Sequence, residues 1–199
     1  MERCFSSSST VRTDAGLEIP ISDVKIGDKL QSASPDGKVV YAEVYGFGHR
    51  EPAAQATVIR VETNHGPMLE LTSTHMLHSG STCCDFNGLV EAKDLEIGAV
   101  IWVVDSDGTM APSTVSSLKT LQATGMFNPL TRSSSLIVNG ISASNFADVP
   151  KWTSPAAVHN WLGPPFRLFL LSTAIPADTI MPMVRSCARM LNPVLTFYM

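Results

Sequence analysis

Residues 21–30 have the sequence Ile-Ser-Asp-Val-Lys-Ile-Gly-Asp-Lys-Leu, and residues 92–101 have the sequence Ala-Lys-Asp-Leu-Glu-Ile-Gly-Ala-Val-Ile. The two stretches lie 71 positions apart and match at three places: Asp23/Asp94, Ile26/Ile97 and Gly27/Gly98. Similarity at a fixed spacing indicates a duplicated structural unit. Each copy places a glycine just before an apolar run, which predicts strand, turn and strand. We therefore expect an all-β fold, a disc of two duplicated subdomains with pseudo-twofold symmetry.

The turns between the predicted strands support the same fold. Residues 34–37 (Ser-Pro-Asp-Gly) and 105–108 (Asp-Ser-Asp-Gly) are strong turn signals at equivalent places after the two copies. Residues 58–71 predict a hairpin about Asn-His-Gly-Pro, which delivers position 72 to the end of a strand. Two further short strands are predicted on either side of Asn139-Gly140.

Three residues supply the chemistry of self-cleavage: Cys4, Thr72 and His75. The Cys4 thiol can attack the carbonyl of the preceding peptide bond and form a thioester, which can pass its acyl group onward. His75 suits the role of general acid for the leaving amine because imidazole titrates near neutral pH. Thr72 can hydrogen-bond and polarise the scissile amide. By contrast, we interpret Asp28 and Asp94 as turn or capping residues.

The motifs, their order and their spacing resemble the Hint (hedgehog/intein) family, specifically the Hog type at the carboxyl end of hedgehog-related proteins. The matching stretches are Cys4-Phe5 with the Ser-Thr-Val that follows, then residues 26–28, 71–75, 95–98, 125–131 and 137–144. The match extends from Cys4 to about Asp148. The resemblance implies a Hint-type β disc and an autoprocessing domain over residues 4–148.

The resemblance also implies a mechanism, an N-to-S acyl shift in which Cys4 attacks the carbonyl of Arg3. The thioester then passes to a second nucleophile, which in hedgehog proteins is cholesterol activated by an aspartate. In this chain His49 aligns with that aspartate, and a neutral histidine can also act as a base. We expect water, a sterol or another lipid alcohol as the second nucleophile. The alternative interpretation of His49, which stands beside Arg50, is a solvated loop residue.

The chain departs from the family pattern at Asn145 and at the residues before Cys4. Asn145 stands where hedgehog domains have a second cysteine, so redox pairing of Cys4 by that route is not expected. Splicing is not expected either, because Asn145 has no preceding His and no following Cys, Ser or Thr. Only three residues precede Cys4, and Arg3 replaces a glycine of hedgehog proteins. We expect a fragment of a longer precursor, in the secretory pathway if that precursor carries a signal, or a copy that has lost its passenger.

Composition indicates one core with an appendage. The chain has 199 residues, of which 44% are hydrophobic and 16% charged, enough to bury a core of about 150 residues. The net charge of −4 and the absence of a basic run argue against a nucleic-acid partner, and no cofactor is predicted.

The cysteines stand at positions 4, 83, 84 and 187 and are not spaced as a disulfide framework. Neighbouring cysteines bond only with strain, so we do not expect a bond between Cys83 and Cys84. A zinc site formed by His75, His78 and one of these two cysteines is disfavoured, because the paired ligand spacing of zinc sites is missing.

From Val149 the sequence changes character. Ser154 and Pro155 predict the start of a helix, and charges and prolines interrupt the apolar segment that follows too often for a membrane span. Trp161, Pro165, Arg167 and Leu168 resemble the start of the hedgehog sterol-recognition extension. We therefore expect a helical, apolar extension over residues 149–199. Two interpretations stay open, lipid-facing helices at a membrane surface over residues 154–185 or a helical cap packed on the β disc.

Two classes of function follow from these patterns. The first is a self-processing, cysteine-dependent enzyme that cleaves the Arg3–Cys4 bond and whose partner is its own N-terminal precursor segment. The second is a non-catalytic Hint-fold module that binds a lipid or protein partner.

Overall fold

The computed structural model describes residues 4–64, 66–84 and 88–145, and this part of the chain is built almost entirely of β-strands. The strands are β1 (Phe5–Ser6), β2 (Thr10–Arg12), β3 (Glu18–Pro20), β4 (Lys29–Ala33), β5 (Val39–Thr63), β6 (Met68–Thr72), β7 (Met76–His78), β8 (Leu89–Glu91), β9 (Val100–Val104), β10 (Met110–Thr131), β11 (Ser135–Val138) and β12 (Ile141–Ser144). Two 3-10 turns, η1 (Ile21–Asp23) and η3 (Ala92–Asp94), interrupt them. The predicted helical extension over residues 149–199 lies outside the described residues.

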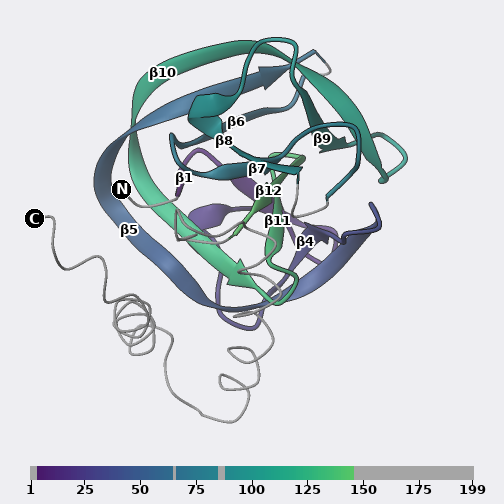
Figure 1. Cartoon of the computed structure of the whole chain (residues 1–199). Coiled ribbons are helices and arrows are strands. Elements are labelled where there is room, and N and C mark those ends of the chain that lie inside the picture. The colour runs from purple at the N-terminus through teal and green to yellow at the C-terminus, as the bar shows by residue number, and fades with distance from the viewer. Residues whose placement is uncertain (1–3, 65, 85–87, 146–199) are drawn as a thin grey trace, which may run out of the picture.

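Two long curved strands, β5 and β10, form the rim of the disc (Figure 1). They run antiparallel and pair from Thr63 with Val115 at one end to Val44 with Thr131 at the other. The short strand β1 lies between β10 and β6, and β6 pairs in turn with β5. The amino end of the described chain is thereby enclosed within the main sheet.

The duplication predicted from the sequence is confirmed by hydrogen bonds that repeat at a shift of 71 residues. In the first copy Gly27 N donates to Val44 O at 2.8 Å, and in the second Gly98 N donates to Val115 O at 2.8 Å. Both glycines have positive φ, 95° and 91°, a conformation that most residues with a Cβ rarely adopt. The shared Ile-Gly pair therefore marks a turn that each subdomain needs.

The predicted hairpins also form. Gly37 N donates to Ser34 O at 2.9 Å and Gly108 N to Asp105 O at 3.1 Å, which closes the two equivalent turns. The turn between β11 and β12 has positive φ at both central residues, 49° and 78°, as Asn-Gly turns in hairpins do.

The core lies between the layers of the disc and is apolar. Phe5 from β1 and Phe127 from β10 are among its largest fully buried side chains, and they pair directly across the two strands. Burial of each ring is worth about 1.5–3 kcal/mol. Because these rings stand at the centre of the core, they fix the position of β1, and with it the residue that precedes Phe5.

One expectation about local structure is wrong. The alternative interpretation of His49 as a solvated loop residue is wrong, because His49 lies within the single strand β5, which also contains Pro52. The register of β5 against β10 shifts between Glu51 and Gln55, where several residues of β5 face Gly125. A proline is tolerated at such a bulge because no backbone N–H is needed there.

Candidate active site

Cys4 is held at the amino end of β1 by strand β6. Its backbone N–H donates to Thr72 Oγ1 at 3.0 Å, and its carbonyl accepts from Thr72 N at 2.9 Å. Cys4 is fully buried and in no disulfide, and Thr72 is only 4% exposed. The structure thus brings together two of the predicted site residues, with the Thr72 hydroxyl on the nitrogen of the bond that precedes Cys4.

The turn from Thr72 to His75 follows directly from β6. His75 N donates to Thr72 O at 3.0 Å, which closes the turn, and Ala92 N at the start of η3 donates to His75 O at 2.8 Å. Lys93 N also donates to Ser73 O at 2.9 Å. The 3-10 turn of the second repeat therefore braces the segment that carries both candidate residues.

The His75 ring is fully buried beside the first strand. Its centroid lies 4.1 Å from that of the Phe5 ring, and its Nε2 lies 2.7 Å from Ser144 O. A carbonyl oxygen only accepts, so Nε2 carries a proton in this contact. The neutral ring is then the Nε2–H tautomer, which leaves Nδ1 as the nitrogen that can exchange a proton.

His49 lies on the same face of the sheet, two strands from Cys4. Phe5 pairs with Phe127, so Cys4 comes opposite Asn128, and Asn128 pairs with His49. Paired residues of antiparallel strands place their side chains on one face. His49 is 12% exposed at its side chain, and its Nε2 lies 3.6 Å from Glu51 Oε1. One row across the sheet therefore contains three of the four predicted residues, together with an asparagine that the sequence analysis missed.

A hydrogen-bond network around the Glu70 carboxylate joins β1 to β6 next to this row. Glu70 Oε2 accepts from the hydroxyls of Ser6 and Ser8, both at 2.8 Å. Arg60 donates to Glu70 Oε1 through Nε at 2.9 Å and Nη2 at 2.6 Å. Burial raises the pKa of Glu70, but hydrogen bonds from Arg60, Ser6 and Ser8 outweigh it, so the net pKa lies below the ordinary value. The ionised carboxylate holds the register that puts Cys4 opposite Thr72.

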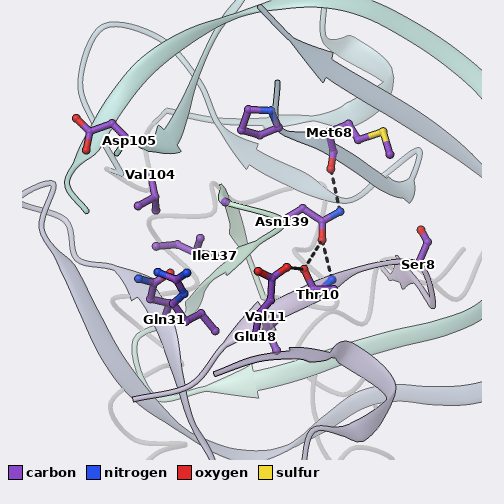
Figure 2. A pocket seen from close by; sticks show the side chains of 13 residues that line it. Ser8, Thr10, Val11, Glu18, Gln31, Met68, Val104, Asp105, Ile137 and Asn139 are labelled. Atoms are coloured by element: carbon purple, nitrogen blue, oxygen red, sulfur yellow. Dashed lines mark hydrogen bonds between the residues drawn. The ribbon is translucent and has the colours of Figure 1, made fainter. Parts of the chain in front are cut away.

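A cavity of about 490 Å³ lies elsewhere on the disc. Figure 2 shows Asn139 at its centre, where the amide accepts from Thr10 N at 2.6 Å and donates to Met68 O at 2.9 Å. None of the four predicted site residues lines this cavity. Its central amide is thus hydrogen-bonded on both sides, and we do not assign the cleavage chemistry to this cavity.

Cys83 and Cys84 form a disulfide, so the expectation that they do not bond is wrong. The chain turns sharply here, since Cys84 has a φ of 65°, and this brings the neighbouring side chains together. Sulfurs in a disulfide are not thiolate ligands. His78 is buried with Nδ1 2.9 Å from Ser142 Oγ, and no group of three or more metal-binding side chains occurs in the described ranges.

Asn145, which stands where hedgehog domains have a second cysteine, is 2% exposed. Its side-chain amide hydrogen-bonds the Thr131 hydroxyl at 2.8 Å. This contact joins the end of β12 to the end of β10, which is a structural role. No helix in the described part of the chain is long and apolar enough to cross a membrane.

Comparison with known proteins identifies the class to which this fold and site belong. A family model of the Hint module matches residues 1–175. The protein hedgehog of Drosophila virilis is 28% identical over 174 residues, which cover 87% of this chain and 35% of the relative. Warthog protein 1 of Caenorhabditis elegans is 30% identical over 141 residues, which cover 71% and 28% of the two chains. The chain therefore belongs to the Hint family.

Solved structures show the same fold. A DnaB intein from Synechocystis has a TM-score of 0.62 at 14% identity, covering 74% of this chain and 99% of the intein. A bacterial intein-like domain from Clostridium thermocellum has a TM-score of 0.56 at 19% identity, covering 71% and 97%. This chain is thus a Hint domain of the hedgehog and intein type, a class consistent with autoprocessing. It spans about a third of the length of the curated relatives it matches.

Proposed function

We propose that this domain cleaves its own precursor at the Arg3–Cys4 bond through an N-to-S acyl shift. The observation that carries the proposal is the 3.0 Å hydrogen bond from Cys4 N–H to Thr72 Oγ1. It puts a hydroxyl on the nitrogen that must become the leaving group. The same residue pair also fixes the backbone of Cys4 through the 2.9 Å bond from Thr72 N to Cys4 O.

The first step adds Cys4 Sγ to the carbonyl carbon of Arg3. A carbon–sulfur bond forms, the π electrons of the carbonyl move to oxygen, and the thiol gives up its proton. The carbon–nitrogen bond then breaks, and the nitrogen leaves as the amine of Cys4 after it accepts a proton. Amide and thiol become thioester and amine with no atom gained or lost.

His75 is the general acid of this sequence. Ser144 O accepts from its Nε2–H at 2.7 Å and so fixes the ring. Nδ1, which carries no proton in the neutral ring, takes the proton that the Cys4 thiol gives up and delivers it to the leaving nitrogen. Thr72 assists the same nitrogen, because an amide nitrogen gains a lone pair as its resonance is lost. The Thr72 hydroxyl can then donate to it.

The acyl group finally moves from Cys4 to a second nucleophile: water, a sterol or another lipid alcohol. We assign His49 to this step because it lies on the row that runs from Thr72 through Cys4 to β5. Its imidazole takes the proton of the attacking hydroxyl. A lipid alcohol is what the resemblance to hedgehog-related proteins implies, whereas the intein structures support the fold alone.

The test is a fusion of a reporter domain ahead of Met1 in the full chain, made with Cys4 intact and as Cys4→Ala. Dithiothreitol should release the reporter from the first protein and not from the second, as followed by electrophoresis and mass spectrometry. A reporter that gains the mass of cholesterol in sterol-containing vesicles identifies the second nucleophile. A precursor with Cys4 that stays whole under all these conditions refutes the enzyme and leaves a non-catalytic module.

A further inference from the structure

Asn128 is a buried polar side chain with no hydrogen-bond partner among the residues that the structure describes. It lies on β10, is 0% exposed, and within the described part of the chain neither its Nδ2 nor its Oδ1 is hydrogen-bonded. Burying an amide in this way opposes folding, and an unsatisfied group in a native structure calls for a specific explanation. The neighbours of Asn128 in the sheet supply one.

The register of the sheet puts Asn128 directly beside the candidate nucleophile. Phe5 pairs with Phe127 and Ser6 with Met126, so one step toward the amino end Cys4 is opposite Asn128. Residues opposite one another in antiparallel strands have Cβ atoms about 4.5–5.5 Å apart, on the same face. Cys4 also packs with Met126, the next residue of β10 on that face. The Asn128 amide and the Cys4 thiol are therefore adjacent.

The direction of the scissile carbonyl follows from peptide geometry. Cys4 N–H is bound to Thr72 on β6. In a planar trans peptide the N–H and the C=O point in opposite directions. A trans peptide that ends at the Cys4 nitrogen therefore directs its carbonyl oxygen away from β6, toward β10.

On β10 the backbone has no donor for that oxygen. A precursor chain that continued the register of Phe5 with Phe127 by two residues would bring the residue before Cys4 opposite position 129. In a regular antiparallel ladder the N–H of position 129 would donate to this carbonyl. Position 129 is Pro129, which has no N–H. The side chain of Asn128, one residue away, is the neighbouring group that can donate instead.

We infer that Asn128 is a catalytic residue of the acyl shift, which donates through Nδ2–H to the carbonyl oxygen of the scissile bond. This inference rests on the proposed function and adds an oxyanion donor to it. When Cys4 Sγ adds to the carbonyl carbon, the electron pair of the broken π bond moves to that oxygen, and Asn128 stabilises the charge. When the carbon–nitrogen bond breaks, the pair returns to form the thioester carbonyl. A donor placed before the reaction costs no reorganisation at the moment of charge development.

The experiment measures dithiothreitol-induced cleavage of the full-chain reporter fusion in two variants. Asn128→Leu keeps the approximate size without polarity, and Asn128→Asp keeps the shape without the NH₂ donor. Both should slow cleavage roughly 100- to 1,000-fold, as removal of an oxyanion donor does in other acyl-transfer enzymes. Ser113→Ala is the matched control, because Ser113 is also buried and unpartnered on β10, among the described residues, but lies away from Cys4. It should cleave at the wild-type rate.

Thermal unfolding separates this role from a structural one. Asn128→Leu should unfold at the same or a higher temperature than the wild type, because it removes an unsatisfied buried amide. Slow cleavage in a protein that is not destabilised supports the catalytic role, whereas a lower Tm with slow cleavage overturns it. Asn128→Ala, which cannot clash, replaces the Leu variant in the cleavage assay alone if the Leu variant fails to fold, because the cavity it leaves lowers the Tm by itself.

The outcome also distinguishes this inference from the proposed function. Wild-type cleavage that depends on Cys4 but is unchanged in Asn128→Leu and Asn128→Asp overturns the role of Asn128 and leaves the acyl shift intact. A wild-type fusion that does not cleave overturns both.

Discussion

Replacement of Thr72 by valine tests the contact on which the proposed mechanism depends. Thr72→Val keeps the size of the side chain but removes the acceptor of the buried Cys4 N–H. An unsatisfied buried donor costs about 1–3 kcal/mol of the free energy of unfolding. For a domain of this size each kcal/mol lowers the Tm by roughly 2–4 °C. We expect the Tm of Thr72→Val to fall by about 2–12 °C.

The effect of Thr72→Val on rate has a separate origin. Only interactions that strengthen toward the transition state accelerate a reaction. The Thr72 hydroxyl gains such an interaction when the leaving nitrogen acquires a lone pair. If that gain is also about 1–3 kcal/mol, its loss slows cleavage roughly 5- to 150-fold.

The assay is dithiothreitol-induced release of the reporter at a temperature where both proteins are folded. Thr72→Ser is the control, because it keeps the hydroxyl, and it should cleave within a few-fold of the wild type. Wild-type cleavage by Thr72→Val, combined with the expected fall in Tm, would refute the reasoning, since Thr72 would then only stabilise the fold.

Three further predictions concern other residues. His75→Gln should slow reporter release roughly 100- to 10,000-fold, as loss of a general acid does, and an unchanged rate in the folded variant would remove His75 from the mechanism. Gly27→Ala and Gly98→Ala should each lower the free energy of unfolding by about 1–2 kcal/mol in urea titrations, because both positions have positive φ and no atom lies within 4 Å of an added Cβ. The pKa of Glu70 is lower in the folded protein than its unfolded value of about 4.5. Ionised Glu70 therefore stabilises the fold fully above pH 4.5, and this stabilisation is lost as the pH falls through the folded pKa. Acid titrations followed by circular dichroism should therefore show a smaller loss of stability below pH 4.5 in Glu70→Gln than in the wild type, and identical curves would contradict this.

Much of the fold could be predicted from local sequence because its turns are set by backbone conformation. The Ile-Gly pairs and the Asn139-Gly140 turn need positive φ, which few residues other than glycine and asparagine adopt. The continuous strand β5 could not be predicted in the same way. Pro52 indicates a break, and only the bulge opposite Gly125 makes a proline acceptable there.

The sequence predicted some of the residues that lie together around Cys4 and missed another for a physical reason. Cys4, Thr72 and His75 were selected by their chemistry, and the structure brings Cys4 and Thr72 into contact. Asn128 was not selected, because its place opposite Cys4 follows only from the pairing of β1 with β10. The signal that could have found it is its position as a polar residue in the apolar run from Met126 to Leu130.

The sequence by itself determined the duplication, the all-β class and the residue types able to form a thioester, because repeats, turns and functional groups are local properties. The tertiary structure alone decided that Cys4 faces Thr72 on one side and Asn128 on the other. Thr72 and Asn128 follow Cys4 in the sequence by 68 and 124 residues. Their register depends on closure of β1 between β6 and β10 around the buried Phe5, a contact that no local pattern encodes.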